Sequence, residues 1–296
     1  MKEENINMDE ENAITQLGDI YILGEHRLIC GDSTDPETVE KVMNGNEPVL
    51  MVTDPPYGVN YKPEWRNPEN IGSIGVCRSK VTSTGKVQND NKVNWSINYS
   101  LFKGSIAYVW CSSLFSPDVS QDLKNCNFEM KSLIIWNKPN FAISRGDYHW
   151  KHELCWYAVK KGHNHHWKGD RKQSTVWDIS INKGFIKSND KNEDEKTMHS
   201  TQKPIECMAR PIRNNTVEGD WVYDPFLGSG TTLIAAEQLK RKCIGIEIEP
   251  AYCDMIVKRY INLLAKDGLI AVIYKNGELI SHKDYIDHIV KDKNEK

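Results

Sequence analysis

The sequence predicts an α/β fold with a mostly parallel sheet and helices on both of its faces. From residue 203 to residue 268, segments with helical periodicity alternate with short apolar segments. This alternation is typical of parallel strands joined by right-handed helical crossovers. Residues 48–53 (PVLMVT) form an apolar run that stops at Asp-Pro-Pro, as expected for a strand buried on both faces of a parallel sheet.

Each further element follows from its local sequence. The expected strands are short apolar segments rich in β-branched or aromatic residues; they lie at 17–32 (two strands around a Gly-Glu-His turn), 48–53, 105–111, 131–137, 152–162, 221–226 and 243–248. Helices are expected at 117–126, 203–213, 231–242 and 250–268. Pro211 should kink or end its helix, because a proline cannot donate a hydrogen bond to the carbonyl of Cys207.

The chain divides into one large domain and polar segments. Residues 17–268 form the main domain, which contains a polar loop at 59–95 and a small polar insert at 163–198. Residues 1–16 are acidic and expected to be disordered, and residues 269–296 form a C-terminal tail. The chain has no apolar run long enough for a membrane span and no signal peptide, so we expect a cytoplasmic protein.

A basic segment stands out in a chain of net charge −3. Residues 131–172 contain nine Lys or Arg and three Asp or Glu. Such an excess is typical of a surface that contacts nucleic-acid phosphates, although an ordinary solvated face gives the same pattern. The candidate DNA-binding side chains are Lys160, Lys161, Lys168, Arg171 and Lys172.

The metal-binding residue types do not form a recognisable site. The eight cysteines contain no CxxC pair, which predicts reduced thiols rather than a disulfide framework. Five histidines lie between residues 149 and 166 without partnered cysteines. Their order does not fit a zinc site, so we expect no metal.

A glycine-rich turn follows the strand expected at 221–226. The sequence DPFLGSGTT (224–232) turns at Gly228 and Gly230 and enters a helix, and glycines let the backbone approach a ligand closely. Glu247 ends the next strand, where a carboxylate can accept both hydroxyls of a ribose. Leu233 replaces the third glycine of a dinucleotide fingerprint, and no P-loop lysine follows. The pattern therefore indicates an adenosine-type cofactor.

A second motif, DPPYG (54–58), follows the apolar strand at 48–53. An exocyclic amine of a nucleobase is a poor nucleophile, because its lone pair is delocalised into the ring. Two hydrogen-bond acceptors can localise that lone pair, and the candidates are the Asp54 carboxylate and the Pro55 carbonyl, held rigidly by Pro56. Tyr57 offers a face on which an extruded base can stack. The motif predicts methylation or similar chemistry at such an amine.

Together these segments resemble the β-class amino-group DNA methyltransferases. In that family the DPPY block precedes the DPFxGSGTT block, as it does here. The segments HRLICGDS (26–33), IIWNKPN, HELCWYAVKKG and HSTQKP (199–204) also match, so the resemblance covers about residues 17–265. It implies a Rossmann-like S-adenosylmethionine-dependent methyltransferase fold, with a mostly parallel seven-stranded sheet, helices on both faces and a circularly permuted motif order. By its position, the insert at 163–198 would correspond to the family's target-recognition insert, and the loop at 59–95 could share that task.

The resemblance also assigns roles to individual residues. Asp54, Pro55, Pro56 and Tyr57 would be the catalytic residues that hold the target base. Asp32 would lie near the cofactor adenine, Glu247 on its ribose, and Thr201 and Lys203 near its carboxylate. The other residues expected to contact the cofactor, S-adenosyl-L-methionine, are Asp224, Phe226, Gly228, Gly230 and Thr231.

The implied reaction is direct methyl transfer to N6 of adenine in double-stranded DNA, after the base is flipped out of the duplex. Methylation of N4 of cytosine is the alternative, because the chemistry at the amine is the same; in this family an Asp at the start of the motif favours adenine. RNA or protein-amide methylation, and an inactive DNA-binding protein, are less favoured. The sequence leaves open a homodimer, a cognate restriction endonuclease and a prokaryotic or phage source.

Overall fold

The protein is described by a computed structural model that covers residues 13–58, 94–142, 147–180, 202–281 and 285. One 11-stranded sheet runs through it in the order β11-β10-β1-β2-β9-β8-β3-β4-β6-β5-β7. The strands are β1 (Ile20–Leu23), β2 (His26–Cys30), β3 (Leu50–Thr53), β4 (Ile106–Cys111), β5 (Phe128–Ala142), β6 (Trp150–Lys160), β7 (Val176–Asp178), β8 (Trp221–Asp224), β9 (Lys242–Glu247), β10 (Ile273–Lys275) and β11 (Glu278–Ile280).

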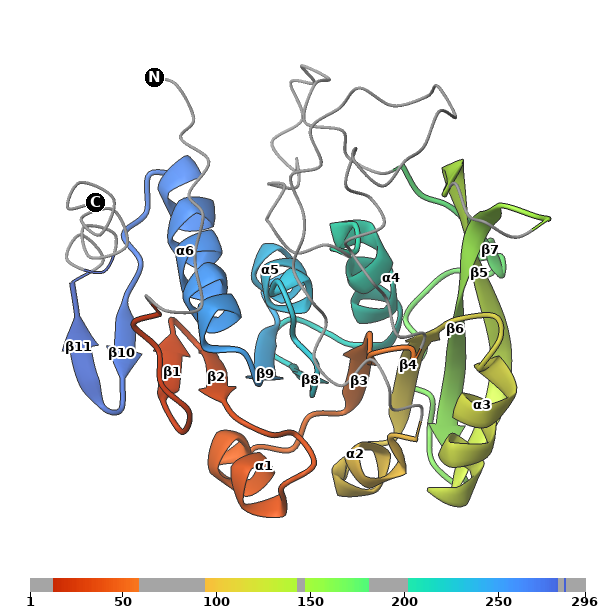
Figure 1. Cartoon of the computed structure of the whole chain (residues 1–296), viewed down its shortest axis with the longest axis horizontal. Helices are drawn as coiled ribbons and strands as arrows, with labels where there is room; N and C mark the ends of the chain where they lie inside the picture. Colours follow the sequence, from red (N-terminus) through yellow and green to blue (C-terminus); the bar gives the residue numbers. More distant parts are fainter. Residues whose placement is uncertain (1–12, 59–93, 143–146, 181–201, 282–284, 286–296) are drawn as a thin grey trace.

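Helices cover both faces of this sheet (Figure 1). Those of one face are α1 (Pro36–Met43), α2 (Ser96–Leu101) and α3 (Ser116–Asn125), and those of the other are α4 (Ile205–Asn215), α5 (Thr231–Gln238) and α6 (Pro250–Lys266). Each layer has its own apolar core against the sheet. The first includes Val42 and Tyr99, and the second includes Ile212 and Ile256.

The expected α/β class with helices on both faces of the sheet is confirmed, but the sheet has 11 strands rather than the expected seven. Its stretch from β2 to β5 contains seven strands. In it β2, β9, β8, β3 and β4 pair in parallel. Strand β6 is antiparallel to both of its neighbours, β4 and β5. This reversal puts the beginning of β6 at the same edge of the sheet as the ends of the parallel strands, which matters for the site below.

The sheet continues beyond the boundaries that the sequence analysis gave. Strands β10 and β11 lie within the expected tail at 269–296, and β10 pairs with β1. Asn276 and Gly277 join them with positive φ angles of 51° and 88°, the conformation that an Asn-Gly hairpin turn requires. At the other end, β7 lies within the insert expected at 163–198 and pairs with β5.

Two other expectations need correction. Residues 13–16 were expected to be disordered, but Thr15 is buried and donates to Asp254 of α6, as does the backbone N–H of Ile14. Helix α4 does not end at Pro211; it continues to Asn215, because a single missing N–H can be tolerated when the helix is packed against the core. The expected loop at 59–95 lies mostly outside the described residues.

The described part of the chain holds seven cysteines, all free and six of them buried. Among the described helices, none combines the length and the apolar character that crossing a membrane requires.

Candidate active site

Parallel strand pairing brings the two sequence motifs together. Met51 of β3 lies opposite Tyr223 of β8, so the segments that follow these strands leave the sheet side by side. The hydroxyl of Thr53 donates to Asp224 Oδ1 at 2.7 Å and ties the two segments together. Since β2 and β9 are the next strands along, Asp32 and Glu247 emerge at the same edge.

One pocket opens at this edge, and both groups of predicted residues line it. From the catalytic group these are Asp54, Pro55, Pro56 and Tyr57; from the cofactor group they are Asp32, Lys203, Asp224, Phe226, Gly228, Thr231 and Glu247. Gly230 lies within the same turn, and Thr201 falls outside the described residues. Trp95, from the expected loop, and Glu153 also line the pocket. A ligand in this pocket therefore contacts both motifs.

The glycine turn takes the conformation that its sequence requires. Gly228 and Gly230 have φ angles of 55° and 83°, which side chains with a Cβ rarely adopt. A Cβ on Gly230 would also lie 2.9 Å from Cγ1 of Ile256. The turn leads directly into α5, which begins at Thr231 on the pocket wall. The first N–H groups of a helix have no partner within the helix, so this end of α5 favours negative or polar ligand groups.

A buried arginine stabilises this turn by hydrogen bonds to Ser229 and Thr231. Arg259 of α6 is buried, and its guanidinium donates to the carbonyl and hydroxyl of Ser229 and to the hydroxyl of Thr231. Nothing in the sequence analysis pointed to it, because its position on α6 is not linked to the motif by spacing. The arginine fixes the backbone that would cradle a cofactor.

Asp224 also organises the turn. Its carboxylate accepts hydrogen bonds from the hydroxyls of Thr53 and Thr232 and from the N–H of Phe226. Burial raises its pKa to about 6, although these hydrogen bonds oppose the shift. These hydrogen bonds hold the turn in its shape, and a direct contact between Asp224 and the cofactor remains a prediction.

Glu247 has the properties expected of a ribose-binding carboxylate. Its side chain is 8% exposed, and its two oxygens accept hydrogen bonds from the N–H groups of Gly228 (2.7 Å) and Glu249 (2.9 Å). Burial raises its pKa to about 7 despite these bonds. A buried carboxylate on the pocket wall, with room for further donors, fits a ligand that carries a pair of hydroxyls.

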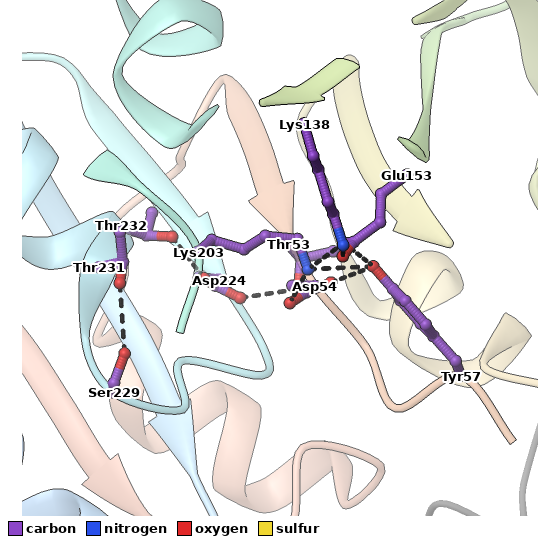
Figure 2. A network of polar contacts seen from close by, with 10 residues as sticks. All are labelled: Thr53, Asp54, Tyr57, Lys138, Glu153, Lys203, Asp224, Ser229, Thr231 and Thr232. Carbon is purple, nitrogen blue, oxygen red and sulfur yellow. Dashed lines mark hydrogen bonds and ion pairs between the residues drawn. The ribbon is translucent and has the colours of Figure 1, made fainter. Parts of the chain in front are cut away.

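Asp54 lies at the centre of a second polar network (Figure 2). Its Oδ2 is 2.5 Å from Nζ of Lys203, and its Oδ1 accepts a hydrogen bond of 2.8 Å from the hydroxyl of Tyr57. Burial raises the pKa of Asp54, while the charge of Lys203 opposes the shift. The carbonyl of Pro56 accepts from the indole N–H of Trp95 at 3.1 Å, so the neighbouring Pro55 carbonyl remains the candidate second acceptor.

Glu153 and Lys138 complete this network, and the sequence analysis missed both. Glu153 Oε2 lies 2.9 Å from Nζ of Lys203 and 3.1 Å from the hydroxyl of Tyr57, and its Oε1 pairs with Lys138. Burial alone would raise the pKa of Glu153, but the charges of Lys203 and Lys138 lower it to about 2. The HELCWYAVKKG segment contained the signal, but Glu153 lies near the beginning of a strand, where a parallel sheet would not place a site residue.

Lys203, predicted as a cofactor-binding residue, contacts the predicted catalytic residue Asp54 in the structure. Its ammonium contacts Asp54, Glu153 and Tyr57. Burial would lower its pKa, but the two carboxylates outweigh burial and raise it. The lysine also lines the shared pocket, so the predicted contact with the cofactor carboxylate stays a prediction.

The five predicted DNA-binding cations differ in their exposure. Lys160 is half-buried; its Nζ donates to the carbonyl of Phe102 and lies 5.5 Å from the ring centroids of Phe102 and Phe128. Burial lowers its pKa. Its ammonium is thus used within the fold, and its assignment as a DNA contact stays a prediction.

The other four predicted DNA contacts are exposed: Lys161, Lys168, Arg171 and Lys172. The backbone N–H of Lys168 donates to the carbonyl of Asn214, near the end of α4. Lys203 precedes the beginning of the same helix, so the Lys168 loop docks at the opposite end of α4 from the pocket. Phosphates reached from this loop would lie away from the pocket mouth.

Comparisons with known proteins agree with this geometry. Residues 49–259 match a family model, N6_N4_Mtase, described as DNA methylase. The Type II methyltransferase M2.MboI of Moraxella bovis is 26% identical over 239 residues, which cover 71% of this chain and 80% of that protein. The Type II methyltransferase M2.LlaDCHI of Lactococcus lactis subsp. cremoris is 27% identical over 275 residues, which cover 88% and 93%.

A solved structure shares the fold. The M1.HpyAVI–SAM complex superposes with a TM-score of 0.54 at 24% identity, covering 78% of this chain and 98% of that chain. The glycine turn and the buried Glu247 fit an adenosine-type cofactor, as argued above. The family match spans both motifs and most of the sheet. This chain belongs to the DNA methylase family of amino-group methyltransferases, and its cofactor is S-adenosylmethionine.

Proposed function

We propose that this protein methylates N6 of adenine in double-stranded DNA, and that it takes the base out of the duplex to do so. The observation that carries the proposal is the shared pocket. Asp54 and Tyr57 line one side of it, and Glu247 and the glycine turn line the other. A base amine beside Asp54 would thus be next to a cofactor bound on the glycine turn.

On the base side, Asp54 accepts one N–H of the target amine. The Pro55 carbonyl accepts the other, so that the nitrogen lone pair is localised and directed at the methyl donor. The proton that the amine loses on methylation can be taken by Asp54, whose burial raises its pKa and makes it a better proton acceptor. Tyr57 provides a ring beside the base, and its hydroxyl is fixed by Asp54 and Glu153.

On the cofactor side, S-adenosylmethionine supplies a methyl group on a positively charged sulfur, which is a good leaving group. Glu247 would accept the ribose hydroxyls, Asp32 would lie near the adenine, and the glycine turn would follow the methionine part. The contribution of these residues is orientation, because holding two reactants in line removes much of the entropic barrier.

Methylation of N4 of cytosine is the alternative, because the family model covers N6 and N4 enzymes alike. Adenine is favoured by the Asp at the start of the DPPY motif, as the family resemblance implies. The test is to incubate unmethylated chromosomal DNA with the protein and S-adenosylmethionine, digest it to nucleosides and identify the product by mass spectrometry. N6-methyladenine supports the proposal, N4-methylcytosine changes only the base, and no modified base refutes it.

Two partners belong to the proposal. The curated relatives are named Type II methyltransferases, which suggests a cognate restriction endonuclease that cuts the same site when it is unmethylated. DNA is the substrate partner, and Lys161, Arg171 and Lys172 are exposed cations that could contact its phosphates outside the pocket. A homodimer is also part of the proposal.

A further inference from the structure

The hydrogen bonds that Asp54 accepts within the protein compete with the hydrogen bond that it would accept from the target base. Both carboxylate oxygens of Asp54 already have donors: Lys203 on Oδ2 and Tyr57 on Oδ1. A carboxylate neutralised by an ammonium at 2.5 Å is a weaker acceptor for a base amine than a free one. Asp54 would accept the base amine more strongly if these donors shifted to another acceptor.

Glu153 offers that place to both donors at once. Its Oε2 lies 2.9 Å from Nζ of Lys203 and 3.1 Å from the Tyr57 hydroxyl. Figure 2 shows the Lys203 ammonium and the Tyr57 hydroxyl close to both carboxylates, joined to them by dashed lines. A small displacement of either donor toward Glu153 would therefore weaken its bond to Asp54, and the Lys203 ammonium would keep a carboxylate partner throughout.

Lys138 makes Glu153 suited to this role. It pairs with Oε1, the oxygen that Lys203 does not use, and it comes from the neighbouring strand β5, where Trp136 lies opposite Glu153. Lys138 thereby holds the carboxylate in place, and the charges of Lys138 and Lys203 lower the pKa of Glu153, which favours its ionised form. In the described part of the chain, Lys203 is the one cation paired with Asp54, so the charge of Asp54 is the one that can be exposed to a base.

We propose that Glu153 is a positioning residue which takes Lys203 and the Tyr57 hydroxyl from Asp54 when the target base enters. Asp54 is then free to accept the base amine. The inference rests on the proposed function, because it assumes that Asp54 addresses a base amine. It assigns to Glu153 a role in the transfer step and none in binding the cofactor.

Two substitutions of Glu153 separate the contribution of its charge to the transfer rate from that of its size. Glu153→Gln keeps the size of the side chain and loses its charge, whereas Glu153→Asp keeps the charge and shortens the side chain. The control is Glu206→Gln, the same chemical change on α4 in an acid that pairs with Arg210 and Arg213 outside the pocket. The assay is the rate of tritium transfer from labelled S-adenosylmethionine to unmethylated chromosomal DNA at saturating concentrations of both. Calorimetry gives the cofactor Kd, and thermal unfolding checks that each variant is folded.

The expected result is a loss of kcat of about 10- to 100-fold in Glu153→Gln, the effect of one lost charge-assisted hydrogen bond. Its cofactor Kd should stay within about twofold of wild type. Glu153→Asp should be more active than Glu153→Gln, and Glu206→Gln should match wild type. A Gln variant as fast as wild type, or faster than the Asp variant, overturns the inference because shape would then matter more than charge. Failure of the proposed function would look different: the wild type itself would transfer no methyl group to DNA.

Discussion

Lowering the pH should weaken the binding of S-adenosylmethionine through one carboxylate, Glu247. Burial raises the pKa of this group to about 7 in the cofactor-free protein. Ribose hydroxyls donate hydrogen bonds to the ionised form, so the pKa should be lower when the cofactor is bound. A proton must then be released on binding, and affinity is lost as the pH falls through about 7.

The magnitude follows from the ionised fraction of Glu247. With a free-state pKa of about 7, nearly all of the group is ionised at pH 8 and about a tenth at pH 6. The cofactor Kd should therefore rise about tenfold over this interval, or about 1.4 kcal/mol. Calorimetry in two buffers of different ionisation enthalpy measures both the Kd and the proton release.

Glu247→Gln is the matched control, because it keeps the side chain's size and cannot titrate. It should bind the cofactor more weakly at pH 8, by about 1–3 kcal/mol for the lost charge-assisted hydrogen bonds, and it should lose the dependence on Glu247 ionisation. Equal pH dependence in wild type and Glu247→Gln would refute the reasoning, since the titrating group would then lie elsewhere, for example on the cofactor.

The remaining predictions concern Arg259, which the sequence analysis missed, and Lys160, whose ammonium is used within the fold. Arg259→Met should raise the cofactor Kd about tenfold, since the hydrogen bonds that brace Ser229 are lost; titration calorimetry checks this, and an unchanged Kd would show that the turn holds its shape alone. Lys160→Ala should lower the free energy of unfolding by about 1–2 kcal/mol through the lost Phe102 hydrogen bond and ring contacts. Urea titrations measure this free energy, and the control variant Lys161→Ala should leave it unchanged. Equal losses of unfolding free energy in both variants would contradict a specific role for Lys160.

The sheet was predictable where the chain alternates regularly between strands and helices. Apolar runs that end beside Asp54 and Asp224 predicted two parallel strands. The pairing of these strands explains why motifs far apart in sequence share one pocket. The strand at 273–275 was missed because three residues carry too little periodicity, although the Asn276-Gly277 pair signalled a hairpin. Short strands are set by the sheet that they join rather than by their own pattern.

The candidate site was predicted in its motifs and missed in its partners. Asp54 and Glu247 stand at the ends of parallel strands, where chemistry is expected in such sheets. Glu153 reaches the same edge only because β6 runs antiparallel, which the sequence did not reveal. Lys160 shows a further limit, since net charge along the chain cannot distinguish an exposed lysine from one whose ammonium donates to a backbone carbonyl of the fold.

Replacing Asp54 tests the central claim most directly. The measurement compares wild type and Asp54→Ala for methyl transfer to unmethylated chromosomal DNA, with the cofactor Kd measured on the same preparations. The account predicts that the variant forms no methylated base within detection while its cofactor Kd stays close to the wild-type value, because Asp54 addresses the base and Glu247 holds the cofactor. Transfer by Asp54→Ala at the wild-type rate would contradict the account.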